Sequence, residues 1–347
     1  MFNNSNKTTK HSVNKCSVLF NKFRKCLVRT ASIITCTAIV ATSVTPAFAA
    51  GITSGTTAAS SYVISNGTTA AKSSVISNEV STDTSVSWPQ APDITCESAI
   101  LVDADTGSIL YEKDAHRKCY PASTTKILTG LLTIENCNLS DTLTFSTAAA
   151  NSINPIEDAN LGMKVGEELT VEQALYALLL YSANEVAYAL AEKVAGSIDA
   201  FVDMMNEKAK EIGATNTHFV NCHGLHDDDH YTTAYDLYLI IKEFSKHDLA
   251  YVIDSLDTYD FTYTDADGNE QVVTIEPTNE FLTGEVNFPD GYSIGSWKTG
   301  TTEEALNCLI MELKNDSTGE EYIALVAGAD GKEALYSAMT ELINKAK

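Results

Sequence analysis

Three short motifs in this sequence carry side chains that together can perform acyl transfer: residues 123–126 (STTK), 182–184 (SAN) and 298–300 (KTG). Ser123 is the candidate nucleophile. Because a serine hydroxyl attacks poorly by itself, it needs a base, and Lys126 would lie on the same helix face three residues later. Burial disfavours a charged ammonium, so a desolvated lysine can accept the hydroxyl proton near neutral pH. The first motif therefore predicts a serine nucleophile activated by a lysine.

The second motif places a hydroxyl and an amide between two apolar helical stretches, 174–181 and 185–194. Ser182 can relay a proton to a leaving amine, and Asn184 can hold Lys126 and a substrate carbonyl. In isolation the same pair is equally well explained as two polar residues that satisfy each other at a helix break. The motif gains functional meaning only beside the other two.

The third motif offers groups that recognise a carboxylate and a carbonyl. Lys298 can attract a terminal carboxylate, Thr299 can hydrogen-bond to it, and Gly300 lets a substrate backbone approach closely. The backbone N–H groups of Thr301 and Ser123 would form an oxyanion hole, in which one donor is typically worth about 3 kcal/mol. An ordinary strand start with an exposed lysine is the alternative for such a tripeptide alone.

The order of the three motifs is more informative than any one of them, because the shorter patterns recur by chance. Ser-x-x-Lys also occurs at residues 12–15, and Ser-x-Asn also occurs at 12–14 and 152–154, whereas Lys-Thr-Gly occurs once. The copy at 152–154 lies in a predicted loop before Pro155. The functional copies must therefore be identified by the elements that carry them.

The predicted strands lie toward both ends of the globular part, and the predicted helices lie mostly between them. Apolar residues at three- and four-residue spacing predict helices over 124–135, 171–195 and 198–212, and a closing helix over 332–345. Short apolar runs predict a hairpin and three later strands, over 99–102, 108–111, 271–275, 307–313 and 321–327. This order predicts a mixed α+β fold, in the broad α/β class, with an antiparallel sheet covered by helices.

Two of these elements bear directly on the motifs. The helix that Ser123 opens is apolar almost all round over 127–132, which predicts a buried helix whose N-terminal dipole favours developing negative charge. The third motif follows a predicted loop over 287–295, so we expect it where a strand that lines a cleft begins.

The N-terminal 49 residues have the composition of an export signal. They contain seven basic and no acidic residues, and they end in an apolar, charge-free run over 31–49. Residues 47–49 (AFA) suit a signal peptidase, so we predict a signal peptide over 1–49 with cleavage before Ala50. A retained anchor is the alternative, but Pro46 and hydroxyl residues dilute the run. We therefore expect a secreted protein.

The segment 50–92 is predicted to be a flexible linker, and 93–347 the catalytic domain. The linker is rich in Ser, Thr, Ala and Gly, and it contains a tandem repeat in which ten of twelve positions match between 55–66 and 67–78. Two short polar copies are too few to stack as a solenoid. The remaining 255 residues are enough for a sizeable core.

Charge and cysteine content exclude several classes of partner. Without the predicted signal, 16 basic residues face 46 acidic ones, a net charge near −30 that makes nucleic acid an unsuitable partner. The five remaining cysteines show no metal-ligand spacing and are predicted to be mostly free thiols, with a single disulfide left open. The cluster His223, His226, 227–229 and His230 is rich in metal ligands but lacks the HExxH helix pattern. We expect neither a metal nor another cofactor.

With these motifs in this order, the chain resembles serine-type D-alanyl-D-alanine carboxypeptidases, the low-molecular-mass penicillin-binding proteins of peptidase family S11. Residues 178–184 (LLLYSAN), 221–225 (NCHGL) and 230–237 (HYTTAYDL) add to the resemblance, which covers about residues 95–330. It implies a fold like that of β-lactamases and transpeptidases, with a helical lobe. It also implies a role in cell-wall biogenesis and cell shape.

The resemblance implies roles for the residues already named. Ser123 would form the acyl-enzyme, Lys126 would accept its proton, Ser182 and Asn184 would serve the proton relay, and Lys298 would bind the substrate carboxylate. The implied substrate is a peptidoglycan stem peptide ending in D-Ala-D-Ala. The implied inhibitors are β-lactam antibiotics, which acylate the same serine.

The chain departs from the family pattern in two places, and three other functions remain as alternatives. Leu306 stands where the family usually has glycine, and Trp297 is unusual before the lysine; both bear on substrate fit. A β-lactamase shares two motifs, but Ala183 and the absence of an acid over 215–225 argue against it and predict a long-lived penicillin ester. Endopeptidase action on cross-links stays open, and a non-catalytic wall-binding module is the last alternative.

Overall fold

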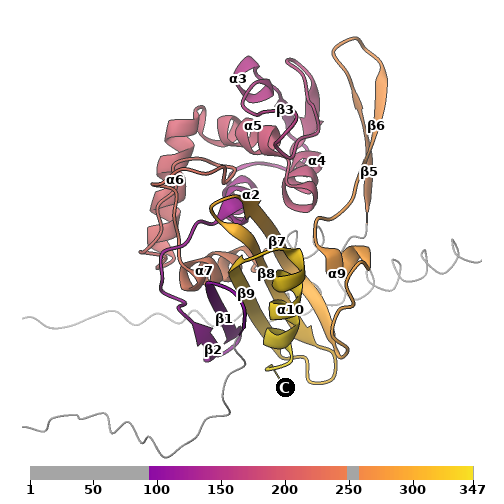
Figure 1. The fold of residues 1–347 in the computed structure, drawn as a ribbon. Helices are drawn as coiled ribbons and strands as arrows, with labels where there is room; N and C mark the ends of the chain where they lie inside the picture. Colours follow the sequence, from indigo (N-terminus) through magenta and orange to yellow (C-terminus); the bar gives the residue numbers. More distant parts are fainter. Residues whose placement is uncertain (1–93, 248–257, 347) are drawn as a thin grey trace, which may run out of the picture. The chain divides into compact units, whose positions relative to one another are not determined.

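A computed structural model describes residues 94–247 and 258–346 (Figure 1). The chain divides into two units, 1–80 and 81–347, and all of the described residues belong to the second. The predicted signal peptide (1–49) and linker (50–92) lie outside the described residues. The predicted catalytic domain thus supplies every element below.

Five strands form one antiparallel sheet in the order β2-β1-β9-β8-β7. The strands are β1 (Ser98–Asp103), β2 (Ile109–Lys113), β7 (Tyr292–Thr302), β8 (Leu306–Asn315) and β9 (Glu321–Ala329). The N-terminal hairpin joins the last strands through β1, with Ser98 opposite Ala327 and Asp103 opposite Tyr322 on β9. The predicted antiparallel sheet is confirmed, and β7 is left at one edge.

Helices cover both faces of the central strands. α10 (Lys332–Ile343) packs on β8 and β9, and α7 (Ala234–Phe244) packs on β1 and β9. Residues 322–327 of β9 are all buried, although successive side chains of a strand point to opposite faces. The sheet is therefore a middle layer, and Figure 1 shows α10 on one side of it.

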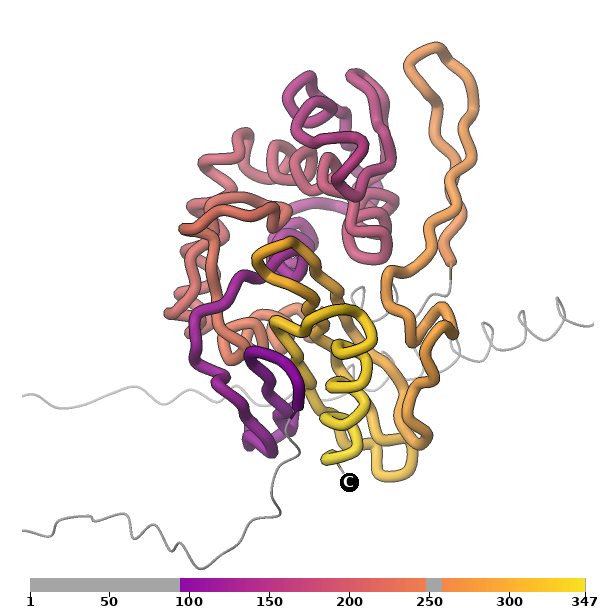
Figure 2. The backbone as a smooth tube through the Cα atoms, in the orientation of Figure 1, coloured from indigo at the N-terminus to yellow at the C-terminus, as the bar shows by residue number. Residues whose placement is uncertain are grey.

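A helical lobe surrounds α2 (Lys126–Asn136), which follows the short 3-10 helix η1 (Ala122–Thr125). Residues 126–133 are all buried, because α5 (Asn184–Ala195), α6 (Ile198–Glu211) and α7 pack around α2. The predicted buried helix is confirmed. Figure 2 shows the start of this helix beside the β7 segment, although the two are far apart in sequence.

The smaller elements form two two-stranded sheets and several short helices. They are β3 (Thr142–Thr144), α3 (Thr147–Ala150), β4 (Glu168–Thr170), α4 (Val171–Tyr176), η2 (Ala177–Tyr181), β5 (Tyr259–Thr264), β6 (Glu270–Ile275) and α9 (Glu280–Thr283). β3 pairs with β4, and β5 pairs with β6. The β5–β6 hairpin packs against α4 through the stacked rings of Tyr176 and Tyr259, whose centroids are 3.8 Å apart.

Two sequence predictions about these elements are wrong. The predicted helix over 171–195 is broken, because α4 runs into a π-helical turn, η2, which ends at Ser182 with a left-handed φ of 69°. The predicted loop over 287–295 already contains the start of β7 at Tyr292, so Lys298 lies inside the strand and not at its beginning. A β-bulge between Ile294 and Trp297 interrupts the regular alternation that marks a strand in a sequence.

No helix within 94–247 and 258–346 is long and apolar enough to cross a membrane.

Candidate active site

The first motif forms a close serine–lysine pair. Lys126 Nζ donates hydrogen bonds to Ser123 Oγ at 2.9 Å and to the backbone carbonyl of His223 at 2.7 Å. The Lys126 side chain has no exposed surface, whereas Ser123 is partly exposed. A buried amine therefore lies beneath a hydroxyl that is accessible from outside.

The surroundings of Lys126 favour its neutral form. Burial lowers the pKa of Lys126 well below its ordinary value, and the positive charge of Lys298 lowers it further. The nearby His223 is also held neutral, because burial lowers its pKa to about 3. A neutral lysine amine can take a proton from the hydroxyl that it contacts.

Two of the strained backbone positions adjoin or belong to the motifs. Four residues other than glycine have positive φ in the described part of the chain: Asp114, Ala122, Ser182 and Leu306. Ala122, with φ 46°, comes immediately before Ser123, and Ser182 belongs to the second motif. Such conformations cost about 1–3 kcal/mol each and persist where the surrounding structure holds them.

The second motif is buried and only partly satisfied. Ser182 and Asn184 are 5% and 3% exposed, and neither Ser182 Oγ nor Asn184 Oδ1 has a hydrogen-bond partner. The backbone N–H of Asn184 donates to the carbonyl of Ala159 at 2.8 Å. We expected Asn184 to hold Lys126, but the lysine donates to Ser123 and His223 instead. Two buried polar atoms are thus left available for a bound group.

The third motif lies on β7, at the edge of the sheet that faces η1. Lys298 is fully buried, and its charge acts on Lys126. A Cβ atom added at Gly300 would lie 2.9 Å from the backbone nitrogen of Ser123, so glycine is what allows strand and nucleophile to approach. These contacts bring the first and third motifs together.

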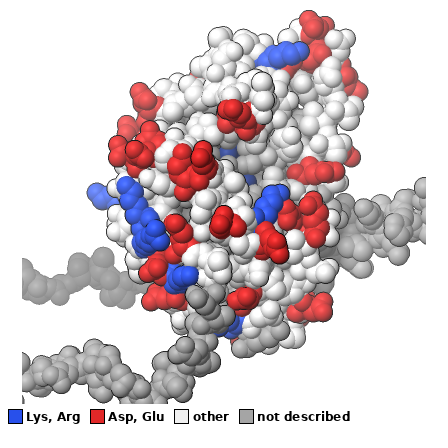
Figure 3. Space-filling model, in the orientation of Figure 1, with Lys and Arg blue, Asp and Glu red and all other residues white. Residues whose placement is uncertain are grey.

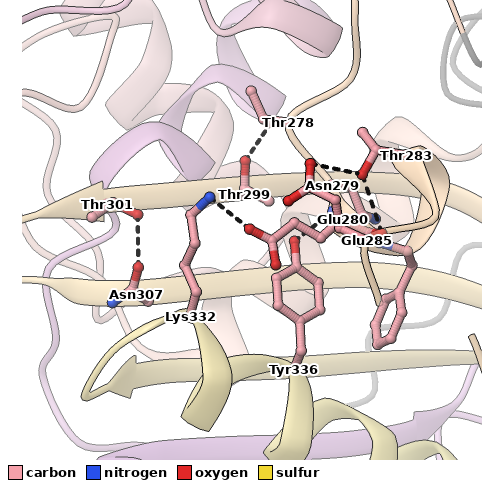
Figure 4. A network of polar contacts seen from close by, with 11 residues as sticks. Thr278, Asn279, Glu280, Thr283, Glu285, Thr299, Thr301, Asn307, Lys332 and Tyr336 are labelled. Carbon is pink, nitrogen blue, oxygen red and sulfur yellow. Dashed lines mark hydrogen bonds and ion pairs between the residues drawn. The ribbon is translucent and has the colours of Figure 1, made fainter. Parts of the chain in front are cut away.

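A hydroxyl that the sequence analysis did not identify stands beside Thr299. Thr278 Oγ1 lies 2.5 Å from Thr299 Oγ1 (Figure 4). The Thr278 backbone N–H donates to the carbonyl of Leu180 at 3.1 Å. Leu180 comes two residues before Ser182. Thr278 therefore links the second motif to the third. No pattern in the sequence marks it, because its position depends on the break at η2.

The remaining site residue, Thr301, has its hydroxyl turned to Asn307 on β8, where Thr301 Oγ1 donates to Asn307 Oδ1 at 3.2 Å (Figure 4). Because β7 is an edge strand, part of its backbone is not used by a neighbouring strand. The Thr301 N–H remains a predicted oxyanion donor.

The sequence analysis also did not identify the backbone carbonyl of His223 as a hydrogen-bond acceptor for Lys126. The sequence analysis placed His223 in a family-like segment, 221–225, and in the histidine- and aspartate-rich cluster, but assigned no role to its carbonyl. The turn of this segment is closed by the Gly224 N–H, which donates to Asn221 Oδ1 at 2.7 Å, and Gly224 has a φ of 90° that favours glycine. The Asn-x-x-Gly spacing is the signal that could have indicated a tight turn.

The histidine- and aspartate-rich segment after this turn has other contacts. His226 lies 3.4 Å from Asp228 and 3.7 Å from Glu304, and its ring meets the edge of Tyr120. Over 94–247 and 258–346, no three His, Cys, Asp or Glu side chains are placed to hold a metal ion. The five cysteines described there are free thiols.

The two departures from the family pattern differ in consequence. Trp297 is 1% exposed, and its ring centroid lies 6.0 Å from Lys298 Nζ, so it packs beside the buried lysine of the third motif. Leu306 has a φ of 55°, the left-handed conformation that a glycine adopts without strain. This chain therefore has leucine at a position where the backbone conformation favours glycine.

Comparison with known proteins gives a consistent result. The model of the peptidase S11 family, D-alanyl-D-alanine carboxypeptidase, matches residues 85–331. D-alanyl-D-alanine carboxypeptidase DacF of Bacillus subtilis is 33% identical over 255 residues, which are 72% of this chain and 61% of DacF. DacA of Escherichia coli K12 is 35% identical over 159 residues, 44% of this chain and 40% of DacA. The chain thus spans less than two thirds of either relative.

Two further similarities cover more of the other protein. The D-alanyl-D-alanine carboxypeptidase of Streptomyces sp. K15 is 29% identical over 264 residues, 73% of this chain and 87% of that protein. The crystal structure of the Streptomyces K15 DD-transpeptidase has a TM-score of 0.67 at 28% identity, covering 73% of this chain and 97% of that one. The similarity in sequence and in fold covers the part that carries all three motifs.

Proposed function

Since the chain belongs to the D-alanyl-D-alanine carboxypeptidase family of serine peptidases, we propose that it removes the terminal D-alanine from peptidoglycan stem peptides. The observation that carries the proposal is the 2.9 Å contact between Ser123 Oγ and the buried amine of Lys126. The chemistry requires a hydroxyl with a neutral base, and this pair supplies both.

In the proposed reaction, Lys126 takes the proton of Ser123 as the hydroxyl oxygen attacks the carbonyl carbon between the two D-alanines. The backbone N–H groups of Ser123 and Thr301 stabilise the oxyanion. Ser182 relays a proton to the leaving amine, and the terminal D-alanine departs. Water then hydrolyses the ester on Ser123 and restores the hydroxyl. The unpartnered oxygen atoms of Ser182 and Asn184 are the groups available to the incoming peptide.

The terminal carboxylate of the peptide would bind next to Lys298. The Lys298 ammonium supplies charge, and the neighbouring hydroxyls of Thr299 and Thr278, 2.5 Å apart, supply two donors. In the absence of substrate these hydroxyls bond to each other. A carboxylate would replace that bond with two charge-assisted ones.

Penicillin would acylate the same serine and remain bound as an ester.

The experiment measures D-alanine release from a peptide ending in D-Ala-D-Ala, together with labelling by fluorescent penicillin, in the wild type and in Ser123→Ala. Ser152→Ala is the matched control, because Ser152 belongs to the chance copy of the second motif. Loss of both signals in Ser123→Ala alone is expected. Equal turnover in wild type and Ser123→Ala would remove the proposed nucleophile, and rapid release of the label would favour a β-lactamase.

Transfer to an amine is the second candidate, because the solved K15 structure carries the name DD-transpeptidase. The acyl-enzyme is common to both reactions, and the acceptor decides between them. Adding glycine or a D-amino acid to the assay separates the two outcomes: free acid indicates a carboxypeptidase, and a new peptide bond indicates transfer. A cross-linked dimer as substrate tests endopeptidase action in the same assay.

We also propose that residues 1–49 direct export and that 50–92 tether the catalytic domain outside the cytoplasm, in the wall or at the outer face of the membrane. The basic start, the apolar run and the AFA sequence at 47–49 support this. Mass spectrometry of the secreted protein would test it, with an N-terminus at Ala50 expected.

A further inference from the structure

The peptide bond between Ala122 and Ser123 carries one of the two proposed oxyanion donors. A trans peptide is planar, so the Ala122 carbonyl and the Ser123 N–H point in opposite directions. Whatever fixes the carbonyl therefore fixes the direction of the N–H. Ala122 needs such fixing, because its φ of 46° is costly for a residue with a side chain.

Two groups hold the Ala122 carbonyl in place. Thr125 Oγ1 donates a hydrogen bond to it at 2.8 Å. Gly224 packs against it so closely that an added Cβ would lie 1.8 Å from the carbonyl oxygen and 2.9 Å from Thr125 Oγ1. Ala122 and Thr125 are both buried. The carbonyl thus accepts a hydrogen bond from the Thr125 hydroxyl and has almost no room to move.

His230 sets the direction of the Thr125 hydroxyl. The Val220 N–H donates to His230 Nδ1 at 3.1 Å, so in the neutral ring the proton lies on Nε2. Nε2 is 2.8 Å from Thr125 Oγ1, which therefore accepts from His230 and gives its own proton to the Ala122 carbonyl. Burial lowers the pKa of His230 to about 4, which keeps the ring neutral at ordinary pH.

On the other side of the same peptide, the Ser123 N–H lies against β7. A Cβ added at Gly300 would come within 2.9 Å of the Ser123 nitrogen and 3.1 Å of Ala122 Cβ. The peptide plane is thus held between the Thr125 hydroxyl and the strand that carries Thr301. A small rotation of this plane would turn the N–H away from the place where the oxyanion forms.

We propose that Thr125 and His230 are positioning residues for the oxyanion hole: the chain of hydrogen bonds from His230 through Thr125 to the Ala122 carbonyl locks the orientation of the Ser123 N–H. The proposal rests on the proposed function, because an oxyanion hole has meaning only for acyl transfer to Ser123. The side chains of Thr125 and His230 would contact neither the substrate nor the Lys126 amine.

Thr125→Val removes the hydroxyl and keeps the shape of the side chain. Loss of a whole oxyanion donor costs about 100- to 1,000-fold, so a misaligned donor should slow acylation by penicillin about tenfold or more. The affinity of the non-covalent complex should change little. Thr125→Ser restores the hydroxyl and should restore the rate. His230→Phe should resemble Thr125→Val, whereas His230→Gln, which keeps an N–H donor, should retain most of the rate.

Thr133→Val is the matched control, because Thr133, on α2, is buried like Thr125 and its hydroxyl also donates to a carbonyl, that of Thr129 at 2.8 Å. It should lower the melting temperature without slowing acylation of the folded protein. A second readout compares an ester substrate with its thiono analogue, whose sulfur is a poorer hydrogen-bond acceptor. The preference for the oxygen ester should shrink in Thr125→Val and stay unchanged in Thr133→Val.

The outcomes separate the two proposals. A wild type that is never acylated contradicts the proposed function itself. A wild type that is acylated, with Thr125→Val acylated at the same rate and with the same ester preference, overturns the positioning role alone. Failure of Thr125→Ser to recover the rate, in protein with wild-type melting temperature, overturns it as well.

Discussion

The tripeptide pattern Ser-x-Asn occurs twice in the described part of the chain, and the two copies have opposite surroundings. At 152–154, Ser152 Oγ donates to the carbonyl of Ala149 at 2.8 Å, and Asn154 contacts Glu157 Oε2 at 2.7 Å and accepts from the Ile156 N–H at 3.1 Å. At 182–184 the side chains are buried, and Ser182 Oγ and Asn184 Oδ1 have no partner.

The difference shows how a functional copy of a weak motif can be distinguished from a chance one. A buried polar atom without a partner costs about 1–3 kcal/mol, so a chain that keeps two of them within one tripeptide retains a destabilising arrangement. The copy at 152–154 has no such cost, because its polar atoms stabilise the turn in which they lie. Two lysines are buried in the same region, Lys126 and Lys298. On the face shown in Figure 3, by comparison, acidic side chains are spread widely and Lys and Arg gather in fewer places.

Substituting each asparagine tests this comparison most directly. Asn184→Ala should reduce acylation by penicillin about 100-fold or more, because it removes a group from the reaction site, and should leave the melting temperature unchanged or higher. Asn154→Ala should leave acylation unchanged and destabilise the fold by about 0.5–1 kcal/mol, because it removes satisfied hydrogen bonds. Similar effects of both substitutions on acylation would show that burial without a partner does not mark the functional copy.

The pH profile tests whether burial and Lys298 keep Lys126 neutral. The positive charge of Lys298 lowers the pKa of Lys126, so Lys298→Gln should raise that pKa. The neutral amine is present above its pKa, and the acidic limb of the acylation rate should therefore move to higher pH. Acylation by a β-lactam, measured over a range of pH, gives the limb. An unmoved limb would mean that the two lysines do not interact in solution.

A smaller effect on activity is expected from the hydroxyls of Thr278 and Thr299, which hydrogen-bond to each other when no substrate is bound. Thr278→Val removes one of the two hydroxyls next to Lys298 and should raise KM about threefold to tenfold for a peptide with a free carboxylate, at nearly unchanged kcat. A peptide amide lacks the carboxylate, so its KM should not change. Equal increases for acid and amide would indicate a general distortion of β7.

The smallest effect is expected on stability, at Leu306, whose strained backbone has no role in the proposed reaction. Leu306 has a φ of 55°, as Ser182 has a φ of 69°, but only Ser182 belongs to a motif. Leu306→Gly should relieve the left-handed conformation and stabilise the fold by about 1 kcal/mol with unchanged activity. Thermal unfolding gives the measurement. Loss of stability would show that packing of the Leu306 side chain outweighs the strain.

The sheet, the closing helix and the buried α2 could be predicted because each depends on a local apolar pattern. The break of the predicted helix over 171–195 could not, since residues 171–195 keep an apolar pattern through the π turn and the left-handed Ser182. The start of β7 was missed for a related reason, because the bulge between Ile294 and Trp297 disturbs the alternation. Local patterns therefore indicated the elements but not their irregularities, which lie at the site.

The sequence by itself determined the identity of the reacting groups, because a hydroxyl, an amine and an amide belong to side chains, and helical spacing alone brings Ser123 next to Lys126. Only the tertiary structure decided how these groups are tuned. Burial and the charge of Lys298 lower the pKa of Lys126, and in our proposal the orientation of the Ser123 N–H depends on Thr125, Gly224 and Gly300. Desolvation, charge and close packing act between segments that are distant along the chain, so these effects could not be predicted from a local sequence pattern.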